Sequence, residues 1–454
     1  MPATRRCFLG SATVAGLAGS LLAQTGPAPG PLPPPRSKND AIQLALIGAG
    51  GQGMDDTRFA LKVPGVKLVA AADIYQGRLI RSKELWGADL FVTRDYREIL
   101  KRADVDAVIV ATPDHWHDRI SIDAMNAGKD VYCEKPMVQQ VEFGWPMVEA
   151  QKSSGRILQV GSQRVSSIIY EKARDLYREG ALGQLNTVEA WWDRNSAIGA
   201  WQYSIPPDAS PDTVDWDAFL GRAPKRPFEP IRLFRWRNYR DYGTGVAGDL
   251  FVHLFSGVHF VTGALGPSRV FASGGLRFWK DGRDVPDVMM GVFDYPETPN
   301  HPAFNLFLRV NFVSGAGDDS GFRFSGSEGV MTIGYNGVTL AKHPRETEPG
   351  YTIGTFPQAV QEEFLKQYHA KYPLERASAA GMKPAAEEQY VAPRGYSDNY
   401  DHFDRFFASV RSRQPVVEDA AFGLRAAGPA LLSNVSYFER RVVEWDAQAM
   451  RVKA

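Results

Sequence analysis

Apolar runs of strand length alternate with helical stretches early in the chain. The apolar runs cover residues 41–47, 66–72, 106–111, 130–134 and 157–161, and stretches with helical periodicity separate them at 54–61, 75–85, 119–127 and 142–152. Strands that alternate with helices form a parallel sheet with helices on both faces. We therefore expect an α/β fold that begins with a doubly wound parallel sheet of the Rossmann type, over residues 41–160.

The pattern changes after residue 161. Strand-like runs now lie at 185–192, 268–278, 288–295, 306–313 and 329–333, with turn residues such as Asn336-Gly337 between or after them. Such turns connect antiparallel hairpins rather than parallel crossovers. Residues 400–440 return to helical periodicity. A second α/β domain over residues 161–454 is the prediction.

The first 40 residues show neither pattern. Arg5 and Arg6 are followed by an uncharged stretch of apolar and small residues that ends near Ala23. This arrangement predicts a signal peptide over residues 1–23, of the twin-arginine type, and hence a periplasmic or other extracytoplasmic location. The alternative is an uncleaved or misassigned start. Residues 24–40 hold six prolines and are expected to form a linker.

Composition narrows the classes of function. The 454 residues include 52 Lys and Arg against 52 Asp and Glu, with 44% hydrophobic residues. These values exclude global disorder and disfavour a nucleic-acid partner, which requires a basic excess. The sequence contains no run of about 18 apolar residues, so no membrane span is predicted. Cys133, in an apolar strand pattern, is expected to be a buried structural thiol. No metal site is predicted, since His259 lies six residues from His253 and off its helical face.

A glycine-rich turn follows the first predicted strand, with the sequence Gly-Ala-Gly-Gly-Gln-Gly at residues 48–53. In a dinucleotide-binding turn, Gly48 permits the tight bend and Gly50 lets the backbone approach a pyrophosphate. Gly53 lets the helix pack close to the strand. Asp73 ends the next strand 20 residues after Gly53, where a carboxylate can bind the ribose hydroxyls and repel a 2′-phosphate. NAD is therefore favoured, with NADP as the alternative cofactor; Asp73 could instead be a helix cap.

The ends of the later strands place further polar residues at the same edge of the sheet. Residues 112–117 (Thr-Pro-Asp-His-Trp-His) follow one strand, and Glu134, Lys135 and Pro136 follow the next. Ligands of doubly wound sheets bind beyond the carboxyl ends of the strands. Both segments are thus expected to face the cofactor.

At this point the chain resembles the Gfo/Idh/MocA (glucose-fructose oxidoreductase / inositol 2-dehydrogenase) family. The resemblance covers nearly the whole chain after the linker, and residues 48–53, 111–117, 128–136 and 245–253 carry it. It implies a Rossmann domain followed by an α/β domain with an open, mainly antiparallel sheet, which often forms an oligomer interface. A homo-oligomer through that sheet is therefore expected. The implied nucleotide-binding residues are Gly48, Gly50, Gln52, Gly53, Asp73, Thr112, Pro113, His117, Glu134 and Lys135.

The resemblance also implies the catalytic residues. Lys135 would hydrogen-bond the substrate hydroxyl, and Asp249 and His253 would complete the site, with His253 as general base. The spacing of Asp249 and His253 supports this independently, because residues i and i+4 share one face of a helix and a carboxylate there can fix the imidazole tautomer. The alternatives are a surface lysine and an ordinary helical ion pair.

Aromatic and arginine side chains downstream fit sugar stacking and hydroxyl recognition, or equally sheet packing. The candidate substrate-binding residues are Gln163, Arg164, Trp192, Arg235 and Tyr242, and the stretches 191–194 and 234–239 share this composition.

The sequence thus predicts an exported NAD-dependent oxidoreductase that acts on a hydroxyl of a sugar or polyol. Because free NAD is scarce outside the cytoplasm, the cofactor should be tightly held and recycled. An NAD-dependent glycoside hydrolase that works by oxidation, elimination and hydration is one alternative. A non-catalytic sugar- or nucleotide-binding protein is another.

Overall fold

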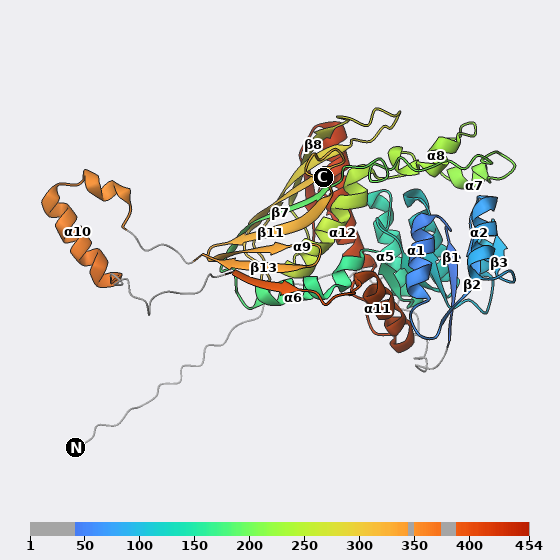
Figure 1. Ribbon diagram of the computed structural model, residues 1–454, viewed down its shortest axis with the longest axis horizontal. Helices are drawn as coiled ribbons and strands as arrows, with labels where there is room; N and C mark the ends of the chain where they lie inside the picture. Colours follow the sequence, from blue (N-terminus) through green and yellow to red (C-terminus); the bar gives the residue numbers. More distant parts are fainter. Residues whose placement is uncertain (1–40, 344–348, 374–386, 454) are drawn as a thin grey trace, which may run out of the picture.

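The computed structural model describes residues 41–343, 349–373 and 387–453, so the predicted signal at 1–23 and linker at 24–40 lie outside the described residues. Within these ranges the chain forms two sheets with helices packed around them (Figure 1). The N-terminal half of the body, blue to teal in the figure, holds the parallel sheet, and the larger sheet lies beside it.

The first sheet has six strands in the described residues, in the order β3-β2-β1-β4-β5-β6, and all its pairs are parallel. This confirms the expected doubly wound fold, although the short strand β3 was not predicted. The elements are β1 (Ile42–Ile47), α1 (Gly51–Ala60), β2 (Val66–Ala72), α2 (Gln76–Trp86), β3 (Phe91–Thr93), α3 (Tyr96–Leu100), β4 (Ala107–Val110), α4 (His117–Asn126), β5 (Asp130–Cys133), α5 (Gly144–Ser154) and β6 (Leu158–Val160).

The strand order changes direction at β1, which pairs with β2 on one side and with β4 on the other. The connections after β1 and β4 therefore leave the sheet toward opposite sides. A crevice opens at the carboxyl ends of strands at such a point. The fold thus brings the glycine turn and the 112–117 segment together at this crevice.

The second sheet has ten strands in the described part of the chain, in the order β14-β13-β12-β11-β7-β10-β9-β8-β15-β16. Strands β7 and β10 are parallel, and the other described pairs are antiparallel, as expected. The strands are β7 (Leu185–Asp193), β8 (Arg269–Gly275), β9 (Val288–Tyr295), β10 (Phe304–Asn311), β11 (Asp319–Gly326), β12 (Gly329–Ile333), β13 (Gly337–Lys342), β14 (Glu387–Val391), β15 (Val443–Asp446) and β16 (Arg451–Val452).

Side chains alternate between the two faces of this sheet. In β9, Met289 and Phe293 are buried whereas Met290 and Val292 are exposed. One face is therefore covered by the protein's own core, and the other is open. The remaining helices are α6 (Ile168–Arg178), α7 (Trp216–Leu220), α8 (Pro230–Phe234), α9 (Val252–Thr262), α10 (Gln358–Lys371), α11 (Asp398–Ser412) and α12 (Ala420–Glu439). Figure 1 shows α10 apart from the body, and none of its residues is buried.

The predicted helical stretch at 400–440 is two helices, α11 and α12, separated by a segment that contains Pro415. Proline removes a helical hydrogen bond and favours such a break. Helix α11 returns to the Rossmann sheet, where Phe403 stacks on Tyr132 with ring centroids 4.3 Å apart. The Gln159 side chain donates to the His402 carbonyl at 2.8 Å. Residues 398–412 therefore complete the core of the first domain, although the prediction assigned them to the second domain over residues 161–454.

Helix α12 packs between the two domains. A Cβ on Gly423 would lie 2.7 Å from a methyl carbon of Val160, and one on Gly428 would lie 2.7 Å from the Trp445 ring. Glycine at these two positions lets the helix approach both the first domain and the second sheet closely. Pro429 lies inside this helix and is buried. The two domains therefore share a continuous packed junction.

Two smaller expectations concern burial. Cys133 is fully buried, and burial raises the pKa of its thiol, so it is a structural residue as expected. Among the described residues, no helix combines the length and apolar character needed to cross a bilayer.

We predict that Phe403→Ala lowers the free energy of unfolding by about 3–5 kcal/mol, because it removes a fully buried ring that joins α11 to the first domain. Urea denaturation followed by circular dichroism measures this. Phe364→Ala, on the exposed helix α10, is the matched control and should change the value by less than about 0.5 kcal/mol. Equal effects of the two substitutions would contradict the structural role of α11.

Candidate active site

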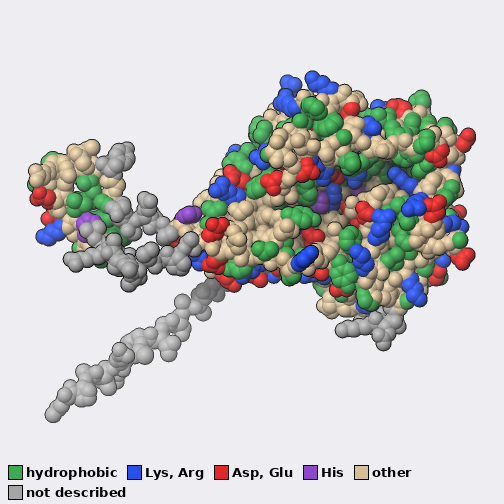
Figure 2. Space-filling model, in the orientation of Figure 1, with side chains coloured by type: hydrophobic (Ala, Val, Ile, Leu, Met, Phe, Trp, Pro, Cys, Tyr) green, Lys and Arg blue, Asp and Glu red, His purple; other side chains and the backbone are tan. Residues whose placement is uncertain are grey.

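A cavity of about 770 Å³ lies over the carboxyl ends of the parallel strands. The residues after β1, β2, β4 and β5 form one wall, and parts of the segment between residues 203 and 237 form the other. Figure 2 shows the hollow between the two halves of the body, with basic and histidine side chains inside it. Most predicted nucleotide-binding residues line this cavity, namely Gly48, Gly50, Gln52, Asp73, Thr112, Pro113, His117, Glu134 and Lys135.

The glycine turn has the geometry that its sequence predicted. Gly48 has φ +96°, and a Cβ there would lie 2.6 Å from the Ala111 carbonyl oxygen. Gly53 lies below the turn rather than in the cavity, and a Cβ on it would lie 2.1 Å from the Gly48 carbonyl oxygen. At Gly51, the first residue of α1, a Cβ would meet nothing within 4 Å. The start of this helix is therefore open to the cavity and fits the pyrophosphate of a dinucleotide.

Asp73 directly follows β2 as a buried carboxylate. It accepts a hydrogen bond from the Tyr75 backbone N–H at 2.9 Å and a longer one from Arg78 at 3.4 Å. Arg78 also lies beside the glycine turn, 3.6 Å from the position of a Cβ on Gly50. An acceptor for ribose hydroxyls and a cation for the phosphates thus flank the same turn. The residues present fit a bound NAD.

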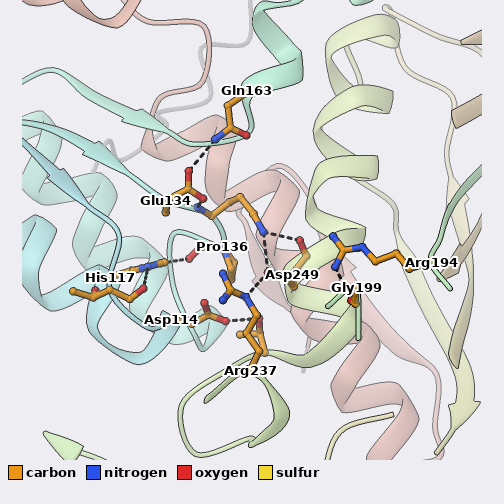
Figure 3. Close-up of polar contacts among 12 residues, drawn as sticks. Asp114, His117, Glu134, Pro136, Gln163, Arg194, Gly199, Arg237 and Asp249 are labelled. Atoms are coloured by element: carbon orange, nitrogen blue, oxygen red, sulfur yellow. Dashed lines mark hydrogen bonds and ion pairs between the residues drawn. The ribbon is translucent and has the colours of Figure 1, made fainter. Parts of the chain in front are cut away.

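Three charged side chains meet where the two domains touch (Figure 3). The Lys135 ammonium donates to the Asp249 carboxylate at 2.8 Å and to its backbone carbonyl at 3.0 Å. Arg237 donates to the same carboxylate oxygen from its Nε at 3.2 Å. Burial alone would raise the pKa of Asp249, but the charges of Lys135 and Arg237 outweigh it and hold the pKa below its usual range. Asp249 is therefore ionised and fixes the position of Lys135.

The local helix around Asp249 differs from the expectation. Residues Ala247–Phe251 form a π-helical turn, and the regular helix α9 begins only at Val252. The assumption of one regular helical face for Asp249 and His253 is therefore wrong. The structure also shows no hydrogen bond between them within the described residues, so Asp249 does not orient the imidazole. The π-turn places the carboxylate on Lys135 and Arg237 instead.

His253 lies against the aromatic ring of Trp192, with ring centroids 5.1 Å apart. Burial, and then the charge of Lys135, lower its pKa well below the usual histidine value, while Asp249 opposes the shift. The imidazole is therefore neutral at neutral pH and can accept a proton. Among the candidate substrate residues, Trp192 is thus the one that contacts a catalytic candidate directly.

His117 joins the two strand ends rather than pointing to a substrate. Its ring nitrogens contact the carbonyl oxygens of Pro136 at 2.8 Å and Thr112 at 2.7 Å (Figure 3). Asp114 is buried, accepts a hydrogen bond from Thr244 at 2.7 Å, and has its pKa raised by burial to about 7. His115 was expected at the rim, but it is buried and bonds the Phe219 carbonyl at 2.8 Å.

Glu134 lines the cavity and belongs to a buried polar group. It accepts a hydrogen bond from Gln163 at 2.9 Å, and burial raises its pKa to about 7. Asp56 lies close by, and burial and the charge of Glu134 also raise its pKa. Gln163, a candidate substrate residue, also donates to Tyr132 at 3.1 Å. In this structure Gln163 holds Glu134 in place.

The structure places three other candidate substrate residues outside the large cavity. Arg164 pairs with Asp398 at 3.5 Å and lines a separate cavity of about 370 Å³. Arg235 donates to the Tyr203 carbonyl at 2.8 Å and to Gln202, so it anchors a loop. Tyr242 is fully buried against His115, in the core.

Sequence reasoning missed the role of Arg237, which lay within the stretch 234–239 noted only for its composition. It lines the cavity and shares Asp249 with Lys135. Its distance of 12 positions from Asp249 gives no helical or strand spacing. Only the fold shows that they pair. Among the described residues, no group of three or more His, Cys, Asp or Glu could hold a metal ion.

Comparison with known proteins agrees with the geometry. A family model for the NAD-binding Rossmann fold of the Gfo/Idh/MocA oxidoreductases matches residues 42–162. A second model, for the C-terminal alpha/beta domain of that oxidoreductase family, matches residues 192–270.

Individual relatives cover shorter parts. An inositol 2-dehydrogenase of Rubrobacter xylanophilus is 30% identical over 165 residues, which are 36% of this chain and 47% of that protein. A glycosyl hydrolase family 109 protein of a Shewanella species is 28% identical over 214 residues, 41% of this chain and 45% of that protein. The chain thus matches less than half the length of these curated relatives. The solved structure of a levoglucosan dehydrogenase with NADH and levoglucosan shares the fold, with a TM-score of 0.62, 19% identity, and coverage of 89% of this chain and 99% of that one.

Proposed function

Because the chain belongs to the Gfo/Idh/MocA oxidoreductases, whose N-terminal domain binds NAD, we propose that it oxidises a hydroxyl group of a sugar or sugar-like polyol. The observation that carries this proposal is the Lys135–Asp249 contact of 2.8 Å, made by a lysine that lines the nucleotide cavity. A neutral histidine, His253, lies four residues beyond Asp249. The resemblance of parts of the chain to an inositol 2-dehydrogenase supports a polyol-like substrate.

NAD, when bound, supplies the hydride acceptor. Lys135 would donate a hydrogen bond to the reacting hydroxyl and stabilise the negative charge that develops on its oxygen. Asp249 keeps the ammonium in place, and because Arg237 contacts the same carboxylate, the two cations together would keep a net positive charge beside the reacting oxygen. His253 would accept the hydroxyl proton, because its lowered pKa leaves the ring neutral.

A second candidate is glycoside hydrolysis by transient oxidation, elimination of the leaving group, addition of water and return of the hydride. The similarity to a glycosyl hydrolase family 109 protein favours it. The same Lys135, Asp249 and His253 would serve the oxidation step in both reactions. The two differ in whether a glycosidic bond is broken and whether the cofactor returns to its starting state.

We also propose that the protein is exported through its paired Arg5 and Arg6 and carries its nucleotide with it. A retained nucleotide requires either a second carbonyl substrate, which accepts the hydride, or the self-contained hydrolase cycle. Export of the protein and retention of its nucleotide form one hypothesis. Outside the cytoplasm free NAD is scarce, so an enzyme that exchanged its nucleotide in each cycle would stop turning over.

A homo-oligomer through the second sheet is the last part of the proposal. Phe271 in β8, Val292 in β9 and Phe307 in β10 are register partners across three strands, and they are 46%, 38% and 43% exposed. A row of exposed apolar side chains on an open sheet face is typical of a protein interface. A second copy of the chain would cover it.

We predict that Lys135→Ala and His253→Ala each lower kcat at least about 100-fold while NADH still binds. Because the nucleotide is proposed to be retained, steady-state reduction of a carbonyl acceptor measures kcat, and the fluorescence of bound NADH measures nucleotide binding. The matched controls are Lys67→Ala, on the surface, and His369→Ala, on the distant helix α10. Full activity of either site variant would refute the assignment.

In the wild type, kcat/KM should fall on the acid side only below the ordinary histidine pKa of 6.5, because the lowered pKa keeps His253 neutral down to that pH.

Denaturing protein purified from the exported fraction should release NAD or NADH at close to one molecule per chain, and its absence would reject the retained cofactor. The same preparation can be given aryl glycosides, or free sugars together with a carbonyl acceptor. Release of the aryl alcohol indicates the hydrolase reaction, and a reduced acceptor indicates the dehydrogenase.

For the oligomer, sedimentation velocity of the wild type should show a dimer or larger species. The double variant Val292→Glu, Phe307→Glu should shift it to a monomer, because two buried charges would lie in the interface. The control Val360→Glu, on α10, should leave the size unchanged. A monomeric wild type would contradict an interface on this sheet.

A further inference from the structure

Arg194 follows β7, and its side chain extends toward Asp249 (Figure 3). Asp249, Lys135 and His253 are called the catalytic group below. Its Nη1 donates to the Gly199 carbonyl at 3.0 Å, and its guanidinium lies over the Phe312 ring at 5.4 Å and near the Trp192 ring at 5.9 Å. The side chain is thus held in one orientation. Trp192, its neighbour on the same face of the strand, contacts His253.

No carboxylate pairs with Arg194 within the described residues. Arg237 and Lys135 share Asp249, and Arg164 pairs with Asp398. Nη1 is used by Gly199, and no hydrogen bond to the described part of the chain uses Nε or Nη2, so these two groups form a free edge of two parallel N–H donors. This edge is the one that binds a carboxylate or phosphate side-on.

The charges around the catalytic group are unbalanced toward positive. Lys135, Arg237 and Arg194 all act on Asp249, which is the ionised acid among them. Lys135 and Arg237 against Asp249 leave one positive charge, and the developing alkoxide uses it. Arg194 is additional to this need. Burial raises the pKa of the neighbouring Asp114 and Glu134 to about 7, so these acids supply only part of a compensating charge.

We infer that the substrate carries an anionic substituent, a carboxylate or a phosphate, that binds the free edge of Arg194 while Lys135 holds the reacting hydroxyl. The inference rests on the proposed oxidation of a sugar and specifies its class, a sugar acid or sugar phosphate. The Trp192 ring lies near both the guanidinium and His253 and would contact the carbon face of the same molecule. Arg194 is thus a specificity residue for that substituent.

The test is a matched panel of hexoses, the corresponding hexuronic acids and the hexose 6-phosphates, assayed by the reduction of a carbonyl acceptor that takes the hydride back from the retained NADH. We expect kcat/KM for one anionic class to exceed that for the neutral sugars at least about tenfold, since a hydrogen bond between two charged groups is involved. The uronic acids and the phosphates distinguish the two sources of charge. Arg194→Gln should collapse the ratio of anionic to neutral kcat/KM, mainly through KM, and Arg194→Lys should restore it partly.

Arg309→Gln is the control, because Arg309 is exposed and pairs with Asp193, away from the catalytic group. It should leave the ratio unchanged. Calorimetric titration of the NADH-loaded protein with the same panel adds a readout that needs no turnover. Anion binding that is lost in Arg194→Gln, without oxidation of any sugar, would support this site and refute the proposed oxidation. Oxidation of neutral sugars with no anionic preference in either assay would overturn the inference and leave the proposed oxidation standing.

Discussion

The arrangement of the active site depends on one buried ion cluster at the junction of the two domains. Lys135 comes from the end of a strand in the first domain, whereas Asp249 and Arg237 come from the second. A buried charge that loses its partner is costly, so the contact favours a single relative position of the two domains. The cavity has walls from both domains, and His253, the candidate base, lies in the second. The ion cluster is therefore what aligns them.

The rest of the fold supports this junction from behind. Helix α12 contacts both domains through glycines that permit close packing, and α11 closes the core of the first domain after the chain has already built the second. The site thus lies between two domains that are not two consecutive segments of the chain, because the first domain is completed by a helix that follows the second sheet. A protein cut at residue 160 would lose the aromatic packing of Phe403 on Tyr132. The alignment of the candidate site and the stability of the first domain consequently depend on the same C-terminal segment.

The sequence predicted those features that depend on local patterns. The parallel sheet follows from the alternation of strands and helices, and the turn at Gly48 from steric requirements that only glycine meets. Lys135 was placed correctly in the crevice because it directly follows a buried strand. Strand β11 was missed because its sequence, Asp-Ser-Gly-Phe-Arg-Phe-Ser-Gly, has only two large apolar residues.

Features that depend on tertiary contacts were not predictable. Lys135 and Asp249 are 114 positions apart, and nothing local indicates that the carboxylate turns to the lysine rather than to His253. Arg235 and Arg237 look alike in sequence, yet one anchors a loop and the other enters the site. Choosing between them requires the course of the backbone.

The π-helical turn at Ala247–Phe251 directs Asp249 and His253 to different partners, whereas a regular helix would place them on one face. Each residue of a helix advances the side-chain direction by about 100°. Shortening this turn by a single residue would rotate Asp249 by about that angle relative to His253, and the carboxylate could no longer contact Lys135 with His253 in its present place. The length of this turn therefore sets the angle between the two side chains, and a single insertion or deletion here would change that angle without replacing either residue.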